Sequence, residues 1–425
     1  MALLNPKFLS KMPKKYSKLL TDNTSFCILP WMHMHTSDSG KTTPCCMYKS
    51  NDILGNANVD SLESIWNDKP MREIRQRMLA GELVEGCKLC YEKDLSGIYS
   101  HRQKMNVDFK HNIILTDNTK EDGSLSSMKL KLWDIRFSNL CNMKCRTCSS
   151  KYSSNWHDDE RKLSEINGIA FNKDKVVSSG RTEDDIFDQF SSQLENMERI
   201  YFAGGEPLIM EEHYRALNEM IDRNLTDIDL IYNTNFSQLR FKKTNVLEKW
   251  NKFSKVTVVA SLDAMGARAE YIRKGTVWEK IEQNRKEMMK ISPNVHFLIG
   301  PAVSIFNIQH IPDFQKTWFE LGYLKINNIQ PTLVQQPIHY RIDIMPAEMK
   351  KRVEEKYVNH IEWLESEGAT QNTVEKYQQI INFMNYDDKS NLIPMFILKT
   401  RELDMIRNEN ILDILPELKE LFNEI

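Results

Sequence analysis

The sequence predicts an α/β protein in which a partial barrel of six strand–helix units follows a small cysteine-rich α+β domain and precedes a set of helices. Short apolar runs alternate with helical stretches between residues 129 and 335, as in parallel sheets whose strands are joined by helices. All eight cysteines lie before residue 149. Beyond residue 340 the sequence is charged, with apolar residues at amphipathic helical spacing.

Length and composition fit a globular protein of more than one domain. The chain has 425 residues, 41% of them hydrophobic and 27% charged. A net charge of −2 argues against a broad nucleic-acid surface and against an anionic membrane surface. No apolar run is long enough to span a membrane, and the first residues lack the order of a secretory signal. We therefore expect a cytoplasmic location, where clustered cysteines are metal ligands and not disulfides.

The cysteine-rich domain is expected over residues 1–105. Ser37-Asp38-Ser39-Gly40 predicts a hairpin turn that carries Cys27 and Cys45 toward one end. Cys87 and Cys90 form a Cys-x-x-Cys pair on a tight loop after a helical run over residues 61–80. Four thiolates from these two places could close around one iron–sulfur cluster or one zinc ion.

The barrel is expected over residues 129–340, after a polar linker over residues 106–128. Its six strands are predicted at residues 129–137, 199–203, 228–232, 256–260, 295–299 and 326–329. Helices such as 210–224 and 276–289 lie between them. Six units indicate an open barrel instead of the closed eight-stranded form.

Two segments lie outside this alternation. Residues 149–196 are polar and long for a simple connection, so they form either an insertion that shapes substrate access or a solvated loop. Residues 341–425 are expected to be a C-terminal helical extension, with helices at 347–365, 373–385 and 396–424. Within the last of these, Asp404 and Arg407 are spaced for a surface pair on one helix.

The most informative motif follows the first barrel strand. Cys141, Cys145 and Cys148 are separated by three and then two residues, and no fourth cysteine is near. This pattern suits a [4Fe–4S] cluster with three irons held by sulfur and one iron open to another ligand. A zinc site that lacks its fourth ligand, or chance, would be the plainer explanation.

Polar and glycine residues end each later strand, so the barrel topology should gather them around one mouth. Gly204-Gly205-Glu206-Pro207 follows the second strand, and its glycines would let the backbone approach a ligand closely. Its carboxylate and carbonyl oxygens could receive an ammonium group. Further candidates end the next strands or follow them, namely Asn235, Ser261, Asp263 and Arg273.

The Cys-x-x-x-Cys-x-x-Cys and Gly-Gly-Glu-Pro motifs together resemble the radical S-adenosylmethionine (SAM) superfamily, whose fold is a partial (β/α)6 TIM-type barrel. The resemblance implies that Cys141, Cys145 and Cys148 hold a [4Fe–4S] cluster whose open iron binds SAM. It implies reductive cleavage of SAM to a 5′-deoxyadenosyl radical, which takes hydrogen from a substrate carbon.

The same resemblance assigns roles to the residues at the strand ends. It implies that residues 204–207 hold the methionyl amine of SAM. It also implies that Ser261 meets the SAM ribose or carboxylate and that Arg273 pairs with the carboxylate, while Asn235 matches the family's Thr-Asn. The sequence departs from the family at Thr147, where an aromatic residue is common.

The N-terminal domain resembles the SPASM and twitch auxiliary-cluster domains of that superfamily, on the spacing of Cys27, Gly40 and Cys45. This implies a second, auxiliary [4Fe–4S] cluster on Cys27, Cys45, Cys87 and Cys90, with Cys46 as a spare buried thiol. In better-known members the domain follows the barrel, whereas here it precedes it. The cluster would accept an electron from the product radical or help to bind the substrate.

Two other functions are open from the sequence. One is an iron–sulfur electron-transfer or scaffold protein without SAM chemistry, although such a protein needs no Gly-Gly-Glu-Pro turn. The other is an enzyme whose N-terminal domain binds zinc and recognises a peptide or RNA. The resemblance to the radical SAM superfamily implies a flavodoxin or ferredoxin-type electron donor. It also implies a substrate that is a peptide or a small molecule, such as a sugar or a nucleotide-linked compound.

Overall fold

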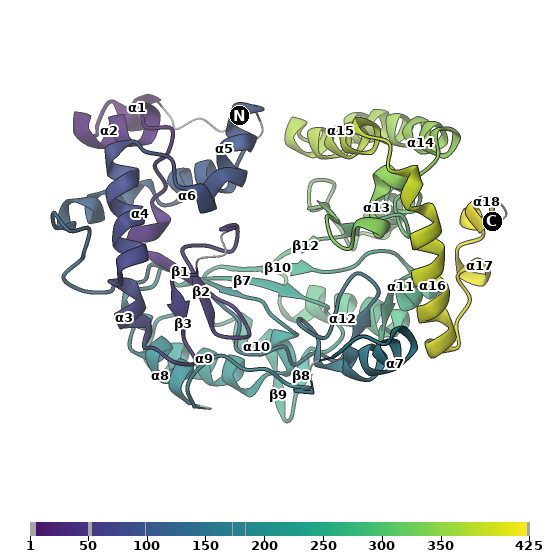
Figure 1. The fold of residues 1–425 in the computed structure, drawn as a ribbon, viewed down its shortest axis with the longest axis horizontal. Helices are drawn as coiled ribbons and strands as arrows, with labels where there is room; N and C mark the ends of the chain where they lie inside the picture. The colour runs from purple at the N-terminus through teal and green to yellow at the C-terminus, as the bar shows by residue number, and fades with distance from the viewer. Residues whose placement is uncertain (1–5, 50–52, 98, 172, 183, 423–425) are drawn as a thin grey trace. The chain divides into compact units, whose positions relative to one another are not determined.

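The fold is described by a computed structural model that covers residues 6–49, 53–97, 99–171, 173–182 and 184–422 (Figure 1). The chain divides into two compact units. The first comprises Met1–Ser138, Ser178–Gly204 and Glu211–Leu230, and the second comprises Asn139–Val177, Gly205–Met210 and Ile231–Ile425. The four-part division expected from the sequence stays a prediction.

The first unit begins with the cysteine-rich segment. Its hairpin joins β1 (His33–Thr36) to β2 (Lys41–Thr43), as predicted, and Gly40 turns the chain with φ of 77°. The helical run over residues 61–80 divides into α3 (Leu62–Trp66) and α4 (Lys69–Ala80), because Asp68 caps a new helix that has a proline in its first turn. The unit's other elements are α1 (Pro6–Leu9), α2 (Lys14–Thr21), η1 (Leu29–Trp31), β3 (Gly55–Asn56), η2 (Glu85–Cys87), α5 (Lys88–Leu95), α6 (His101–Asp108), η3 (Lys110–Asn118), β4 (Leu132–Ile135), α8 (Asp185–Ser191), η5 (Leu194–Asn196), β6 (Arg199–Phe202) and α9 (Glu211–Asp222).

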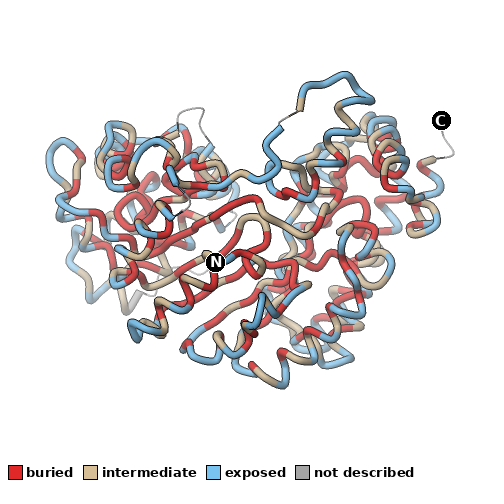
Figure 2. Tube along the Cα trace, turned by 90° about the horizontal axis from the view of Figure 1, so that it is seen from below, coloured by how far each residue is buried: buried red, intermediate tan, exposed pale blue. Residues whose placement is uncertain are grey.

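The strands of the first unit follow the order β6-β4-β1-β2-β3. β1 pairs with β4 in parallel, with His35 opposite Asp134, and β4 pairs with β6 in parallel, with Asp134 opposite Tyr201. The sequence did not predict that a strand of the cysteine-rich segment would continue the sheet of the first barrel strand. One face of these three strands carries Met34, Trp133 and Ile200, each at most 1% exposed. Figure 2 colours the buried stretches of the chain red.

The segment expected as a polar linker is packed into the first unit. Asn106 accepts a hydrogen bond from the backbone of Ile28 at 2.8 Å, and Ile113 is buried. Arg102 donates to the carbonyl of Phe26 at 2.9 Å. Helix α6 therefore fixes the backbone on both sides of Cys27.

In the second unit the main strands are β7 (Asp229–Thr234, from Ile231 on), β10 (Val256–Ala260) and β12 (His296–Ile299), in the order β12-β10-β7. Shorter pairs are β5 (Lys144–Cys145) with β11 (Arg273–Lys274), β8 (Arg240–Phe241) with β9 (Thr244–Asn245), and β13 (Ala302–Val303) with β14 (Thr332–Leu333). The helical elements are η4 (Ser154–Trp156), α7 (His157–Asn167), η6 (Pro207–Ile209), α10 (Val246–Trp250), α11 (Gly266–Ile272), α12 (Trp278–Ile291), α13 (Ile311–Glu320), η7 (Ile338–Tyr340), η8 (Ile342–Ile344), α14 (Ala347–Ser366), α15 (Gln371–Tyr386), η9 (Ser390–Leu392), α16 (Ile393–Arg407), α17 (Ile411–Ile414), η10 (Pro416–Leu418) and α18 (Lys419–Phe422).

The mixed α/β class with parallel strands is confirmed, and five of the six expected barrel strands are present. The sixth, at 326–329, is no strand, because its backbone turns at Asn328 and only Ile329 bridges to Ile299. The helices expected at 347–365 and 373–385 are confirmed as α14 and α15. The helix expected at 396–424 instead ends at Arg407, because Asn408 adopts the left-handed conformation, and the short helices α17 and α18 follow; residues 423 and 424 lie outside the described residues. Barrel closure stays a prediction. Among the described residues, no helix is both long and apolar enough to cross a membrane.

Candidate active site

The loop that carries Cys141, Cys145 and Cys148 is held by the segment that follows it. The backbone N–H of Cys141 donates to Ser154 Oγ at 3.2 Å, and the Trp156 indole donates to the carbonyl of Cys145 at 2.8 Å. Asn155 donates to the carbonyl of Asn142 at 3.1 Å. The start of the 149–196 segment is therefore part of the scaffold of the loop, and its next part forms helices α7 and α8.

The structure brings the three thiols of this loop together. All three are half-buried, and burial is the main cause that raises the pKa of Cys141 and of Cys148 to about 12. A negative charge on Cys145 raises both values further, and Cys141 and Cys148 also interact, so the three sulfurs are neighbours. Within the described residues, no three His, Cys, Asp or Glu side chains converge on a position for a single metal ion. Three neighbouring thiols fit a cluster, in which each thiolate binds its own iron.

The Gly-Gly-Glu-Pro turn packs directly against this loop. A Cβ on Gly205 would lie 2.1 Å from the carbonyl oxygen of Leu140, and the N–H of Glu206 donates to that same oxygen at 2.7 Å. Glycine is required at position 205 because the backbone of residue 140 fills the space of a side chain. Sequence reasoning explained the glycines by a ligand, whereas the contact seen here is with the cysteine loop.

Glu206 is buried and surrounded by donors. Its carboxylate accepts from Thr234 Oγ1 at 2.7 Å, from the N–H of Asn235 at 2.6 Å and from the N–H of Leu208 at 3.0 Å. Burial raises its pKa to about 6 despite these three hydrogen bonds. The carboxylate therefore fixes the turn to the end of β7, and Pro207 begins η6 directly after it.

Asn235 continues this connection to the cysteine loop. Its amide donates to Asn142 Oδ1 at 2.8 Å and its Oδ1 accepts from Ser237 Oγ at 2.7 Å, while Asn142 donates to Ser237 Oγ at 2.9 Å. Asn142 and Ser237 were missed by sequence reasoning. Only their positions could have indicated a role in the site, since Asn142 lies inside the cysteine motif and Ser237 stands two residues after Asn235.

Arg273 lies between an aspartate and a cysteine. Its Nε and Nη2 donate to the fully buried Asp263 at 2.7 and 3.1 Å, and its Nη1 faces Cys145 Sγ at 3.7 Å. β5 and β11 pair so that Arg273 lies opposite Cys145. Asp263 thus occupies one edge of the guanidinium that the sequence assigned to a carboxylate of SAM. Ser261 donates its N–H to the carbonyl of Thr234 at 2.7 Å, at the end of β10.

The C-terminal helix α16 binds the cysteine loop through buried charges. The fully buried side chain of Arg146 contacts Asp404 and stacks on Tyr271, with 3.6 Å between the guanidinium and the ring centroid. Arg407 donates to Asp159 Oδ2 at 2.8 Å and to the carbonyl of Lys144 at 2.8 Å. The prediction that Asp404 and Arg407 form a surface pair was wrong, because each instead holds a buried partner far away in sequence.

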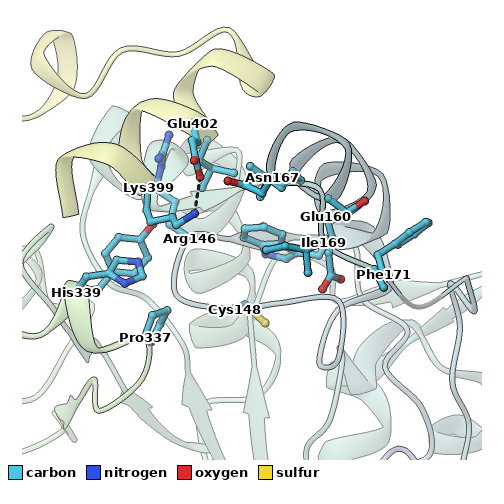
Figure 3. A pocket seen from close by; sticks show the side chains of 16 residues that line it. Arg146, Cys148, Glu160, Asn167, Ile169, Phe171, Pro337, His339, Lys399 and Glu402 are labelled. Atoms are coloured by element: carbon cyan, nitrogen blue, oxygen red, sulfur yellow. Dashed lines mark hydrogen bonds and ion pairs between the residues drawn. The ribbon is translucent and has the colours of Figure 1, made fainter. Parts of the chain in front are cut away.

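A pocket lies beside Cys148 between α7, α16 and the segment around Pro337 (Figure 3). Its volume is about 270 Å³. Apolar and aromatic side chains such as Trp156, Phe171 and Tyr340 line most of it, and Lys399 and Glu402 form an ion pair of 2.8 Å at its wall. Part of the 149–196 segment therefore shapes a pocket next to a candidate cluster ligand.

The thiols of Cys27, Cys45, Cys87 and Cys90 form a second group, within the first unit. Burial raises the pKa of Cys27 and of Cys87 to about 12, and electrostatic interactions connect each of the four to others of the group. Cys87 ends η2, and Cys90 lies in the first turn of α5. Cys46 is exposed and not buried as the sequence predicted, and it interacts with Cys45 but not with the other three thiols; Asp134 and Arg136 are the charges that act on its own thiol. Of the two adjacent cysteines, Cys45 is therefore the member of this group.

Comparison with known proteins identifies this segment. Residues 27–91 match the model of the SPASM family, which is described as an iron–sulfur cluster-binding domain. The first unit contains a SPASM domain. All four cysteines of the second group lie within its bounds, so the SPASM-like domain that the sequence predicts is confirmed.

Solved structures resemble the chain more distantly. "Native anSMEcpe with bound AdoMet" is 19% identical over 56% of this chain and 60% of that one, with a TM-score of 0.37. "Native anSMEcpe with bound AdoMet and Cp18Cys peptide" is 16% identical over 53% and 56%, with a TM-score of 0.34. "Structure of TYW1 with a lysine-pyruvate adduct bound" is 11% identical over 56% and 72%, with a TM-score of 0.27. The match thus spans less than two thirds of the first two of these chains, and no curated protein matches.

Proposed function

We propose that this protein is a radical SAM enzyme with one auxiliary [4Fe–4S] cluster in its SPASM domain. The observation that carries the proposal is the direct contact between the Gly-Gly-Glu-Pro turn and the loop of Cys141, Cys145 and Cys148. The missing side chain of Gly205 and the hydrogen bond from Glu206 to Leu140 create this contact. An electron carrier needs the cysteine loop alone, whereas an enzyme that binds a second ligand at the open iron needs a cradle beside it.

In this proposal each residue has a defined task. Cys141, Cys145 and Cys148 hold the first cluster, and Cys27, Cys45, Cys87 and Cys90 hold the auxiliary one. When bound, the first cluster supplies the electron that cleaves SAM to a 5′-deoxyadenosyl radical, which abstracts hydrogen from a substrate carbon. The electrons come from a flavodoxin or ferredoxin-type donor.

The polypeptide contributes binding and orientation at this site. The carboxylate of Glu206 already accepts three hydrogen bonds, so the carbonyl oxygens of residues 204–207 are the groups left to receive the methionyl ammonium. Asn235 and Ser261 set the ends of β7 and β10 beside them. Arg273, held by Asp263, keeps a positive charge beside Cys145, where it stabilises a thiolate.

The test compares two cysteine variants after anaerobic reconstitution. Replacement of Cys141, Cys145 and Cys148 together by alanine should abolish 5′-deoxyadenosine formation and lower the iron content from about eight to about four per chain. The matched control is Cys46→Ala, which removes a cysteine outside both groups and should keep about eight irons. Formation of 5′-deoxyadenosine by the triple variant with dithionite, or an unchanged electron paramagnetic resonance spectrum when SAM is added to the wild type, would overturn the proposal.

A further inference from the structure

A row of polar side chains crosses three parallel strands of the first unit. His35 on β1, Asp134 on β4 and Tyr201 on β6 are register partners, so they lie side by side on one face of the sheet. Arg136 stands two residues after Asp134, just past the end of β4, and shares this face. The opposite face carries the buried apolar side chains described above, so the row is not explained by the core.

Asp134 organises the row. It is 4% exposed, and its Oδ2 lies 3.1 Å from His35 Nδ1 while its Oδ1 lies 3.5 Å from Arg136 Nε. Burial opposes its charge, yet the contact with His35 and the charge of Arg136 hold its pKa at about 2. A charged carboxylate therefore fixes the orientation of both neighbours.

Two side chains of the row, Arg136 and Tyr201, have hydrogen-bond donors that a ligand could use. Within the described residues, neither Nη1 and Nη2 of Arg136 nor the hydroxyl of Tyr201 has a hydrogen-bond partner. Arg136 is 25% exposed in its side chain, and Tyr201 is half-buried. The edge of a guanidinium that carries two N–H groups matches the two oxygens of a carboxylate or a phosphate.

The position of the row agrees with a ligand site. His35, Arg136 and Tyr201 lie at or just past the carboxyl ends of their strands, which is where parallel sheets bind ligands. Cys46 is an exposed residue, and its thiol interacts electrostatically with the same Asp134 and Arg136. Solvent therefore reaches this face at Arg136 and Cys46, while Asp134 and His35 are nearly buried and hold the row in place.

We propose that Arg136, oriented by Asp134, and Tyr201 on the neighbouring strand bind an anionic group of the substrate, either a carboxylate or a phosphate. This inference deepens the proposed function, because it names a substrate class for the same enzyme. It assigns Arg136 the two-point contact with the anion and Tyr201 a single hydrogen bond. Asp134 and His35 are positioning residues.

The experiment titrates two probes, glutarate and inorganic phosphate, into the anaerobic holoenzyme by isothermal titration calorimetry. We expect one of them to bind saturably, which also decides between a carboxylate and a phosphate. Arg136→Gln should weaken that binding about tenfold or more, and Tyr201→Phe should weaken it severalfold. The matched control is Arg181→Gln, which removes an exposed arginine of the same unit that pairs with Asp185 and should bind the probe as the wild type does.

Iron content and melting temperature establish that each variant is folded and loaded. Absence of binding to the wild type, or equal binding by Arg136→Gln and the wild type, would overturn the inference. SAM cleavage by the wild type is measured separately, without either probe. Failure of the proposed function would appear there, and failure of the anion site would appear only in the calorimetry.

Discussion

At the scale of single residues, the site shows how much depends on close backbone approach. Gly205 and Glu206 both contact the carbonyl oxygen of Leu140, immediately before Cys141: Gly205 leaves room for this oxygen, and the N–H of Glu206 donates to it. The sequence motif was found from its residue types, but its physical reason is a contact between two loops. The carboxylate of Glu206 likewise stabilises the turn, because it accepts hydrogen bonds from three donors, and the motif alone did not reveal this.

We predict that Gly205→Ala displaces the turn from the cysteine loop. The new Cβ would meet backbone atoms, which cannot move aside as a flexible side chain can, so the expected cost is about 1–3 kcal/mol. Iron content after reconstitution should fall, because the loop loses its contact at Leu140. Gly168→Ala is the control for backbone strain alone: its φ of 65° makes alanine costly at the end of α7, but its Cβ would meet no atom within 4 Å, so iron content should stay at the wild-type value. Equal iron content in Gly205→Ala and the wild type would contradict the packing argument.

At the scale of elements, sequence reasoning succeeded where the pattern is local. The hairpin at Gly40, five barrel strands and the helices at 347–365 and 373–385 follow from periodicity and turn residues, which act over a few positions. It failed where distant segments meet. Asp404 is 258 residues from Arg146, and β1 pairs with a strand about a hundred residues later. Nothing in the local pattern near residue 404 distinguishes a buried ion pair from an exposed one.

The same limit applies to the division of the chain. Residues 106–128 are rich in polar side chains, so the sequence predicts a linker there, and Asn106 and Asn112 are nevertheless buried within the first unit. A polar residue is buried when its hydrogen bonds are satisfied, and here the acceptor and donor lie on other segments. Composition alone does not reveal which distant residues provide these hydrogen bonds.

We predict that Asp404→Asn destabilises the second unit strongly. Arg146 has a fully buried side chain, and the variant leaves its charge with one fewer carboxylate partner. Breaking a buried pair in this way costs about 3–5 kcal/mol, which should lower the melting temperature by several degrees. Because Arg146 stands between Cys145 and Cys148, the electron paramagnetic resonance signal of the reduced protein should also change.

The matched control for α16 is Glu402→Gln. Glu402 lies on the same helix and pairs with the part-exposed Lys399, so its loss should cost at most about 0.5 kcal/mol. If Asp404→Asn melted at the same temperature as this control, Arg146 would not depend on the C-terminal helix.

At the scale of the whole molecule, three buried histidines and the half-buried His310 are held neutral. Burial lowers the pKa of His33 to about 4 and that of His213 to about 3, and it also lowers those of His310 and His360 to about 4. Unfolding returns each to about 6.5, so the unfolded chain binds more protons than the folded one between these values. Their stabilising effect is complete above pH 6.5 and is lost as the pH falls toward 4.

Glu206 acts in the opposite direction. Burial raises its pKa to about 6, so the folded protein takes up a proton there before the unfolded chain does. Stability from this group is gained as the pH falls from about 6, and at pH 5 it amounts to about 1 kcal/mol. The stability gained from this one carboxyl group is smaller than the stability lost from the histidines. We therefore expect the folded protein to be less stable in acid.

We therefore predict that the protein loses stability between pH 7 and pH 5, with about 2 kcal/mol from each of His33 and His213. Urea unfolding followed by tryptophan fluorescence at the two pH values measures the difference. His213→Phe removes one titrating ring from an aromatic cluster with Phe202 and Tyr214, so the difference between the two pH values should shrink by about 2 kcal/mol whatever the change in absolute stability. His296→Gln, at an exposed position, should leave the difference unchanged. A pH difference in His213→Phe as large as that of the wild type would show that the buried ring does not govern acid unfolding.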